Sequence, residues 1–168
     1  MPQYAVPDSD ISDGSWTEAD GFGTDLSNQV DNGIEGGTPN DGTSIRNPSG
    51  GSSTCELGLQ SLTDPDDDSN HIIRVRGNDF TSNTVDVDIY DGASLVDGTT
   101  FNFNGTVSNY SYTLTGYPAN YNDLRVKLTT SSTALNVYEV ELEVPSAGGG
   151  GGGDVEDPTN PEAFLMFL

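Results

Sequence analysis

The feature that most constrains the fold is an alternation of apolar and polar residues, which runs from Thr54 to Val144. Successive side chains of a β-strand point to opposite faces of a sheet, so this alternation is typical of strands with one buried face. Seven such segments are separated by turn-forming residues, at the intervals expected of an antiparallel sandwich. They are Cys55–Leu59, His71–Arg76, Thr84–Tyr90, Phe101–Asn104, Tyr110–Thr115, Leu124–Thr130 and Asn136–Val144.

The two faces of these segments carry different predictions. The inward positions are expected to form the core, and they include Leu57, Ile73, Val75, Val87, Leu114, Val126 and Leu142. Four of the five basic residues lie on outward positions: Arg74, Arg76, Arg125 and Lys127. The last segment presents Glu139, Glu141 and Glu143 outward. If these strands are neighbours, the opposite charges should pair across the sheet.

Composition agrees with an all-β chain of one domain. Thr, Ser, Asn, Asp and Gly are abundant, while Lys, Glu and Ala are scarce, as expected of short strands joined by turns. A length of 168 residues suits one domain with a real core.

Residues 1–53 differ from the rest, because their apolar residues are sparse among Gly, Ser, Asp and Asn. We expect an irregular N-terminal arm with ordered loops that packs on a sandwich of residues 54–144. The spacing of Phe22, Leu26 and Val30 predicts one short helix over residues 24–32. Trp16, the only tryptophan, is expected to close the edge of the core.

The charge balance limits the partners of the chain. Lys and Arg number 5 against 27 Asp and Glu, a formal net charge of −22. Binding to nucleic acid through its phosphates requires clustered Lys and Arg, so nucleic acid is not an expected partner. Most acidic residues stand beside Gly, Ser or Asn, which favours a solvated acidic surface over a site.

Targeting signals are not evident in the sequence. The start, Met1–Tyr4, has no basic or apolar stretch typical of a signal peptide, and no apolar run is long enough for a membrane span. Cys55 is the single cysteine, so we expect no internal disulfide and a buried apolar role for this residue. An extracellular type of composition without an export signal fits a protein released by lysis, as in a virus particle.

The C-terminal part is predicted to be a tethered hook. Residues 145–162 form a flexible linker that contains the uninterrupted run Gly148–Gly153, and residues 163–168 are an apolar anchor. We expect the anchor to be buried against another protein chain through Phe164, Leu165, Met166, Phe167 and Leu168. The alternative is a tail that folds back on its own sandwich.

Residues that could carry chemistry are few. The single histidine, His71, opens a strand beside an acidic turn and is expected to be solvated or to cap, so we predict no enzyme and no cofactor. Asp64, Asp66, Asp68 and Asn70 match the first four ligand positions of a calcium loop. The loop lacks its required glycine, at Ser69, and its glutamate, at Val75. It fails as an EF-hand, and a weak calcium site is the alternative to a solvated turn.

Aromatic residues offer a second kind of site. Glycan binding needs exposed rings, and Tyr117 and Tyr121 lie in a connection between strands, where they are candidate glycan contacts. The aromatic residues of the neighbouring strands are instead expected to fill or line the core: Phe101, Phe103, Tyr110 and Tyr112.

The assembled motifs resemble small β-sandwich proteins of tailed bacteriophages and prophages. The matching residues are Gly14–Thr17, Cys55–Leu59 with Thr63–Pro65, His71–Arg76, Tyr112–Thr115 and Tyr121–Val126. The resemblance covers roughly residues 8–130, and its motifs are mostly strand and turn chemistry. It implies a jelly-roll-like sandwich and a place in a virus particle, and it brings no catalytic residues. The glycine run and apolar tip are not part of this pattern.

These observations favour a virion structural protein, one that decorates or cements a capsid, with a head-fibre or tail accessory protein as a near variant. The expected partners are the major capsid protein or like subunits in a homo-oligomer, without nucleic acid or membrane. The expected location is the virion, after synthesis in the host cytoplasm. Two alternatives remain open: a carbohydrate-binding adhesion module, and a subunit of an extracellular filament that adds its tail to a neighbour's sheet.

Overall fold

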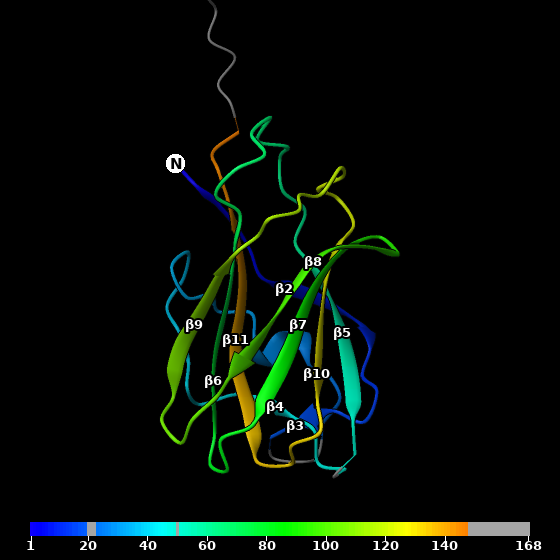
Figure 1. Ribbon diagram of the computed structural model, residues 1–168, viewed down its shortest axis with the longest axis vertical. Coiled ribbons are helices and arrows are strands. Elements are labelled where there is room, and N and C mark those ends of the chain that lie inside the picture. Colours follow the sequence, from blue (N-terminus) through cyan, green and yellow to red (C-terminus); the bar gives the residue numbers. More distant parts are fainter. Residues whose placement is uncertain (20–22, 50, 148–168) are drawn as a thin grey trace, which may run out of the picture.

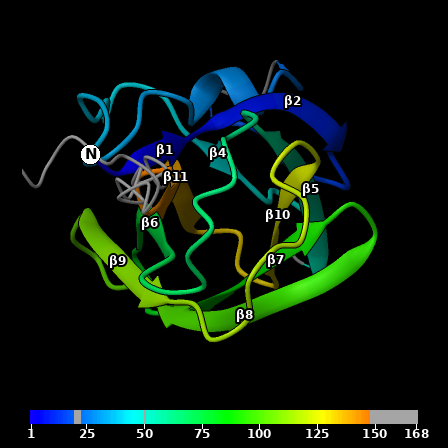
Figure 2. The ribbon, with the colours of Figure 1, turned by 90° about the horizontal axis from the view of Figure 1, so that it is seen from above.

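The computed structural model describes residues 1–19, 23–49 and 51–147, which form two antiparallel sheets packed face to face (Figures 1 and 2). Sheet A has the order β3 (Thr17–Glu18), β4 (Ile45–Arg46), β11 (Leu135–Val144), β6 (Ile72–Asp79) and β9 (Ser108–Thr113), with β1 (Gln3–Ala5) also paired to β11. Sheet B has the order β2 (Pro7–Ser12), β5 (Ser53–Leu59), β10 (Leu124–Thr130), β7 (Thr84–Asp91) and β8 (Ser94–Asn102).

The predicted antiparallel sandwich is confirmed. Each of the seven alternating segments overlaps one of the strands β5 to β11. All the core residues named above are buried, and none of them is more than 1% exposed. One boundary differs, because β8 begins at Ser94 and not at Phe101. The added residues do not alternate, but they pair with β7 along most of its length.

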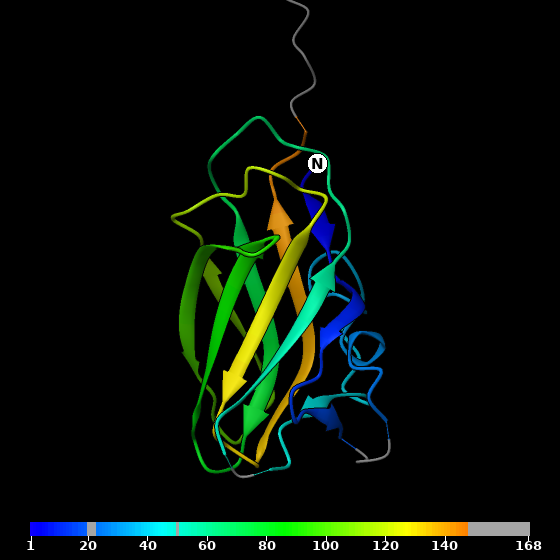
Figure 3. The same ribbon diagram turned by 90° about the vertical axis from the view of Figure 1, so that its right-hand side faces the viewer.

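The N-terminal residues take a larger part in the sandwich than predicted. They were expected to be an arm outside the sheets, but β1 to β4 all lie within residues 1–53 (Figure 3). β1 pairs with β11, and after Val6 the chain crosses to the other sheet, where β2 pairs with β5. Short strands that gain their backbone hydrogen bonds from a strong neighbour need little alternation of their own, so the pattern did not reveal them.

The helix predicted over residues 24–32 is reduced to one 3-10 turn, η1 (Ser27–Gln29). The carboxylate of Asp10 accepts hydrogen bonds from the backbone N–H groups of Leu26 and Ser27, at 2.8 and 2.7 Å. Leu26 and Val30 are buried, as their spacing suggested, but the turn suffices to bury both. In the described part of the chain, no helix is long and apolar enough to cross a membrane.

Opposite charges pair as predicted for Arg74, but Arg125 and Lys127 lie in the other sheet from the last strand and find a different partner. On sheet A, Glu141 lies opposite Arg74, which also contacts Glu143 at 2.5 Å. On sheet B, Arg125 and Lys127 both contact Glu56, at 3.2 and 3.5 Å.

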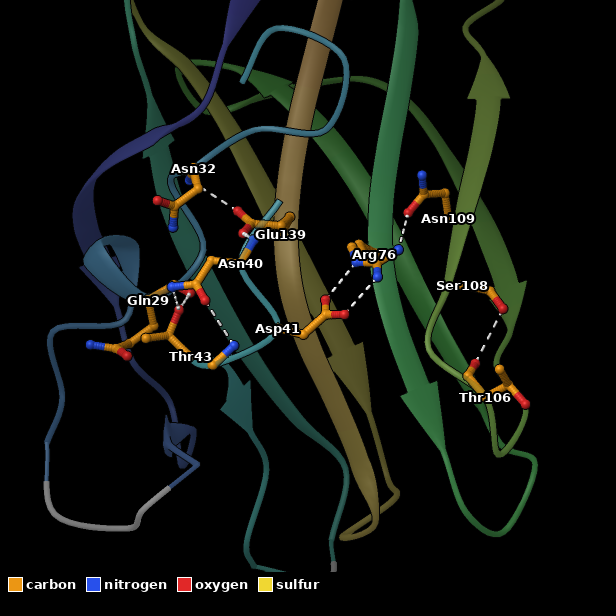
Figure 4. A network of polar contacts seen from close by, with 11 residues as sticks. Gln29, Asn32, Asn40, Asp41, Thr43, Arg76, Thr106, Ser108, Asn109 and Glu139 are labelled. Carbon is orange, nitrogen blue, oxygen red and sulfur yellow. Dashed lines mark hydrogen bonds and ion pairs between the residues drawn. The ribbon is translucent and has the colours of Figure 1, made fainter. Parts of the chain in front are cut away.

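Arg76 lies opposite Glu139 in the register, but its guanidinium binds Asp41 instead, with Nε 2.6 Å from Oδ1 (Figure 4). Asp41 belongs to residues 31–44, which we call the cover loop because they pass over the outer face of β11. Asp41 of the cover loop therefore replaces Glu139 as the partner of Arg76. The strand pattern does not predict this contact, because Asp41 lies outside the alternating segments.

Two carboxylates of β11 lie buried beneath the cover loop. Glu139 accepts backbone N–H hydrogen bonds from Asn32 at 2.9 Å and Asn40 at 2.7 Å (Figure 4). Glu141 accepts them from Ile34 and Gly36, both at 2.8 Å. Both side chains are fully buried, so these hydrogen bonds replace the water that each carboxylate lost. Burial raises the pKa of Glu139, and the N–H groups of the cover loop oppose that rise.

Neighbouring residues of β6 test the register. Ile73→Ala should lower the free energy of unfolding by about 2–5 kcal/mol, since it empties a fully buried site between the sheets. Ile72→Ala is the matched control, because Ile72 is only half-buried on the other face of the strand and should cost much less. Urea denaturation of both variants measures the difference. Equal losses would contradict the register.

Candidate functional site

A groove lies on the outer face of sheet B, along β7 and β8. The alternation of β7 directs Asp86, Asp88 and Tyr90 to this face, as the sequence predicted. The groove has a volume of about 350 Å³. Its lining residues are Asp86, Asp88, Leu95, Gly98, Thr99 and Thr100, and we call it the sheet B groove.

The sequence of β8 opens this groove. Gly98 lies opposite Asp88, and a Cβ atom at position 98 would stand 2.1 Å from Oδ1 of Asp88, so any larger residue would require that carboxylate to move. A register shift after Ile89 brings Leu95 opposite Tyr90. The result is an apolar side chain, 59% exposed, at the end of a polar groove.

The charged groups of the groove differ in their surroundings. Asp86 accepts a hydrogen bond from the hydroxyl of Thr100 at 2.6 Å. Asp88 accepts no side-chain or loop hydrogen bond from any described residue, which leaves its oxygens available to a ligand. Burial raises the pKa of Asp88, and the neighbouring Asp86 raises it further, while Lys127 lowers it.

An aromatic ring and a cation stand beside the carboxylates. The ammonium of Lys127 lies 3.9 Å from the centre of the Tyr90 ring, within the range of a cation–π contact. Lys127 also lies opposite Asp88 in the register. Carboxylates that accept hydrogen bonds, threonine hydroxyls and an exposed apolar side chain together suit a ligand rich in hydroxyl groups.

The two tyrosines predicted as glycan contacts, Tyr117 and Tyr121, lie away from the sheet B groove, in the loops at one end of the sandwich. Tyr121 is 3% exposed, and its hydroxyl is 2.7 Å from Nε2 of His71. Burial, with nearby aspartates, raises the pKa of Tyr121 to about 12. A sugar could not stack on this ring unless the surrounding side chains moved. Tyr117 is half-buried, with its ring centre 5.0 Å from that of His71.

His71 is buried, contrary to the expectation of a solvated or capping side chain. Its Nδ1 lies 3.1 Å from the carbonyl oxygen of Ser69, so both ring nitrogens have polar partners. Burial lowers the pKa of His71, against the opposing effect of the Ser69 carbonyl and nearby aspartates. Strand β6 begins just after His71, and no sequence pattern indicates that the following loops would close over this side chain.

The proposed calcium ligands lie on an exposed turn. Asp64, Asp66, Asp68 and Asn70 are all exposed, and the backbone N–H of Asp66 donates to Oδ1 of Asp64 at 2.9 Å. Asp66 and Asn70 have φ values of 52° and 54°, in the left-handed region that Asp and Asn tolerate in turns. Among the described residues, no three His, Cys, Asp or Glu side chains gather as metal ligands.

The aromatic residues of the strands, the single tryptophan and the single cysteine lie in or beside the core. Phe103 stacks on Tyr110, with ring centres 4.5 Å apart, and Phe101 is also buried, as expected of core aromatics. Trp16 is 1% exposed and its indole N–H donates to the carbonyl of Ser53. Cys55 is buried, which raises the pKa of its thiol. The predicted anchor residues, 164–168, lie outside the described residues.

The sheet B groove was missed at the sequence level although its β7 half was placed correctly. The β8 half shows no alternation, so the sequence pattern predicted no strand before Phe101. Gly98 between Asp97 and two threonines was the available signal, because glycine within a strand often marks a close approach.

Comparison with known proteins supports the fold. No protein-family model matches the sequence, and no curated protein matches it. Among solved structures, the chain is similar to the C-terminal CBM6 of LamC, a marine laminarinase from Zobellia galactanivorans. That match has a TM-score of 0.54 and 10% identity, and it covers 86% of this chain and 100% of that one. At such identity the likeness extends to the β-sandwich fold alone.

Two other solved structures resemble the chain more weakly. CBM35 from Paenibacillus barcinonensis has a TM-score of 0.43 at 10% identity, with 87% of this chain and 99% of that chain covered. Tailspike protein 4 of bacteriophage CBA120, in its enzymatically active domain, has a TM-score of 0.45 at 12% identity. The match covers 84% of this chain but only 19% of that chain.

The buried imidazole gives a pH prediction. Because burial lowers the pKa of His71, the folded protein takes up fewer protons than the unfolded chain below the ordinary histidine pKa of about 6.5. The stabilising contribution is therefore complete above about pH 6.5 and is lost as the pH falls below that value. Urea unfolding between about pH 7.5 and pH 5 should show this decline.

His71→Phe is the control variant, because phenylalanine keeps a ring but cannot ionise. Its free energy of unfolding should decline less over the same pH range. Glu139, whose pKa is raised, contributes to both proteins, so their difference isolates the histidine. The same pH dependence in both proteins would show that folding does not shift the pKa of His71.

Proposed function

We propose that this chain is a non-catalytic, carbohydrate-binding module that holds a neutral saccharide in the sheet B groove. The observation that carries the proposal is the Asp88 carboxylate beside Gly98, which has no hydrogen-bond partner among the described residues. Tyr90 follows it on the same face of β7, with Leu95 opposite. Sugar hydroxyls donate hydrogen bonds to carboxylates, and the C–H face of a sugar packs on apolar side chains. The sandwich fold shared with the CBM6 structure is compatible with this function.

Charge selects the class of saccharide. The chain has a formal net charge of −22, and two of the groove residues are aspartates. An acidic polysaccharide would be repelled over a long range at low ionic strength. A neutral, hydroxyl-rich glycan meets no such barrier, so it is the ligand class that we propose.

Electrophoresis through gels that contain neutral glucan, galactan or mannan tests the groove. The wild type should be retarded on at least one neutral gel and not on alginate, which is anionic. Tyr90→Ala and Asp88→Ala should each weaken binding at least about tenfold, or ~1.4 kcal/mol, by removing the ring or the free acceptor.

Tyr117→Ala is the matched control, since it removes a tyrosine from the loop end and leaves the groove intact. It should bind like the wild type. Loss of binding only in Tyr117→Ala would move the site to the loop end, and a wild type retained on no neutral gel would contradict the function.

A second candidate function is a structural role in a virus particle, as a capsid decoration, cement or accessory protein. It is favoured by the sequence Gly148–Gly153 followed by the apolar residues 163–168, a combination suited to a tethered hook. A glycan-binding sandwich and a tethering tail are compatible in one chain, since a particle can carry its own adhesion module.

Deletion of residues 148–168 tests this role. The truncated protein should remain folded, because β11 ends at Val144 and all the described strands lie before the deleted residues. It should no longer be incorporated into particles that take up the full chain, as measured by the composition of purified particles. Full occupancy by the truncated protein would show that the tail is not the anchor.

A further inference from the structure

One stretch of the sequence carries no charged residue, which is unusual for so acidic a chain. No Asp, Glu, Lys, Arg or His lies between Asp97 and Asp123, although the whole chain has a formal net charge of −22. This uncharged stretch includes all of β9, which is an edge strand of sheet A. Copies of a strongly acidic protein repel one another, so they can meet most easily through a surface without charge.

The free edge of β9 presents backbone groups in a regular row. The N–H of Leu114 donates to the carbonyl of His71. This hydrogen bond shows which residues of β9 direct their backbone groups towards β6 and which direct them away from it. Tyr112 and Tyr110 therefore direct their N–H and C=O groups towards β6, and the next residues direct theirs away. The outward set is Asn109, Ser111 and Thr113, whose backbone groups have no partner among the described residues.

The other strands at sheet edges carry features that discourage pairing with a further strand. β2 contains Pro7, two aspartates and two register shifts. β8 contains Asp97, Gly98 and one register shift, and β3 has only 2 residues. Charges, prolines and bulges are the usual protection of an edge, and β9 has none of them.

We propose that β9 pairs antiparallel with β9 of a second copy, with Ser111 opposite Ser111 on the two-fold axis. In this register Asn109 meets Thr113 of the other copy, and all three outward residues find backbone partners. The half-buried rings of Tyr110 and Tyr112 lie on the inner face and meet each other across the axis. The dimer continues sheet A through both copies and places no like charges opposite one another.

Sedimentation equilibrium at physiological and at high salt tests the proposal with the full chain. The wild type should sediment as a species of twice 17.7 kDa. The two copies should associate more tightly at high salt, because salt screens the repulsion between acidic copies. In the dimer the amide hydrogens of Asn109, Ser111 and Thr113 should exchange slowly and become fast on dilution. A wild type that stays at 17.7 kDa at all concentrations would overturn the dimer.

Two variants at the axis and one control locate the interface. Ser111→Glu places its carboxylate opposite Arg74 in the monomer, which favours folding, but brings two carboxylates together in the dimer. Ser111→Pro removes the outward N–H. Both should weaken the dimer at least about tenfold. Gln60→Glu adds the same charge at an exposed loop position and should dimerise like the wild type. Dimers that persist in both Ser111 variants, or that are lost in Gln60→Glu, would contradict β9 as the interface.

Discussion

Two buried carboxylates on β11 need hydrogen-bond donors, and this need determines the path of the N-terminal third of the chain. Glu139 and Glu141 would be strongly unfavourable in a dry environment without donors. Backbone N–H groups of the cover loop supply those donors, so the loop must cross sheet A where these glutamates stand. The same central strand pairs with β1, β4 and β6, which makes β11 the element on which sheet A is assembled.

The alternation from Thr54 to Val144 was enough to predict both faces of β5 to β11, because burial of one face imposes the period of two. It was not enough where pairing, and not burial, fixes the structure, as in β1 to β4 and the first half of β8. Glu139, Glu141 and Glu143 look alike in the sequence. Only the path of the cover loop makes two of them fully buried and leaves Glu143 half-buried. The groove shares this origin, since it needs Gly98 and a register shift that no periodicity reveals.

Acidic surfaces and a strand without charged residues, β9, lie on different parts of this protein. The loop ends and outer faces carry the acidic residues, in part neutralised by arginine and lysine pairs on each sheet. These pairs are buried or half-buried, and they join neighbouring strands, so they help to fix the register of each sheet. The proposed binding through polar groups in a groove, and the proposed assembly through an edge strand without charged residues, would both avoid the long-range repulsion that accompanies an acidic partner.

Antiparallel pairing at an edge has a geometric consequence for the molecule as a whole. A two-fold axis between two β9 strands stands perpendicular to sheet A, so sheet B of each copy lies on the same side of the joined sheet. The two grooves then point in one direction. A polymeric ligand, or a cell surface with many glycan chains, would be held at two points, and a weak affinity at each groove would become firm attachment through avidity.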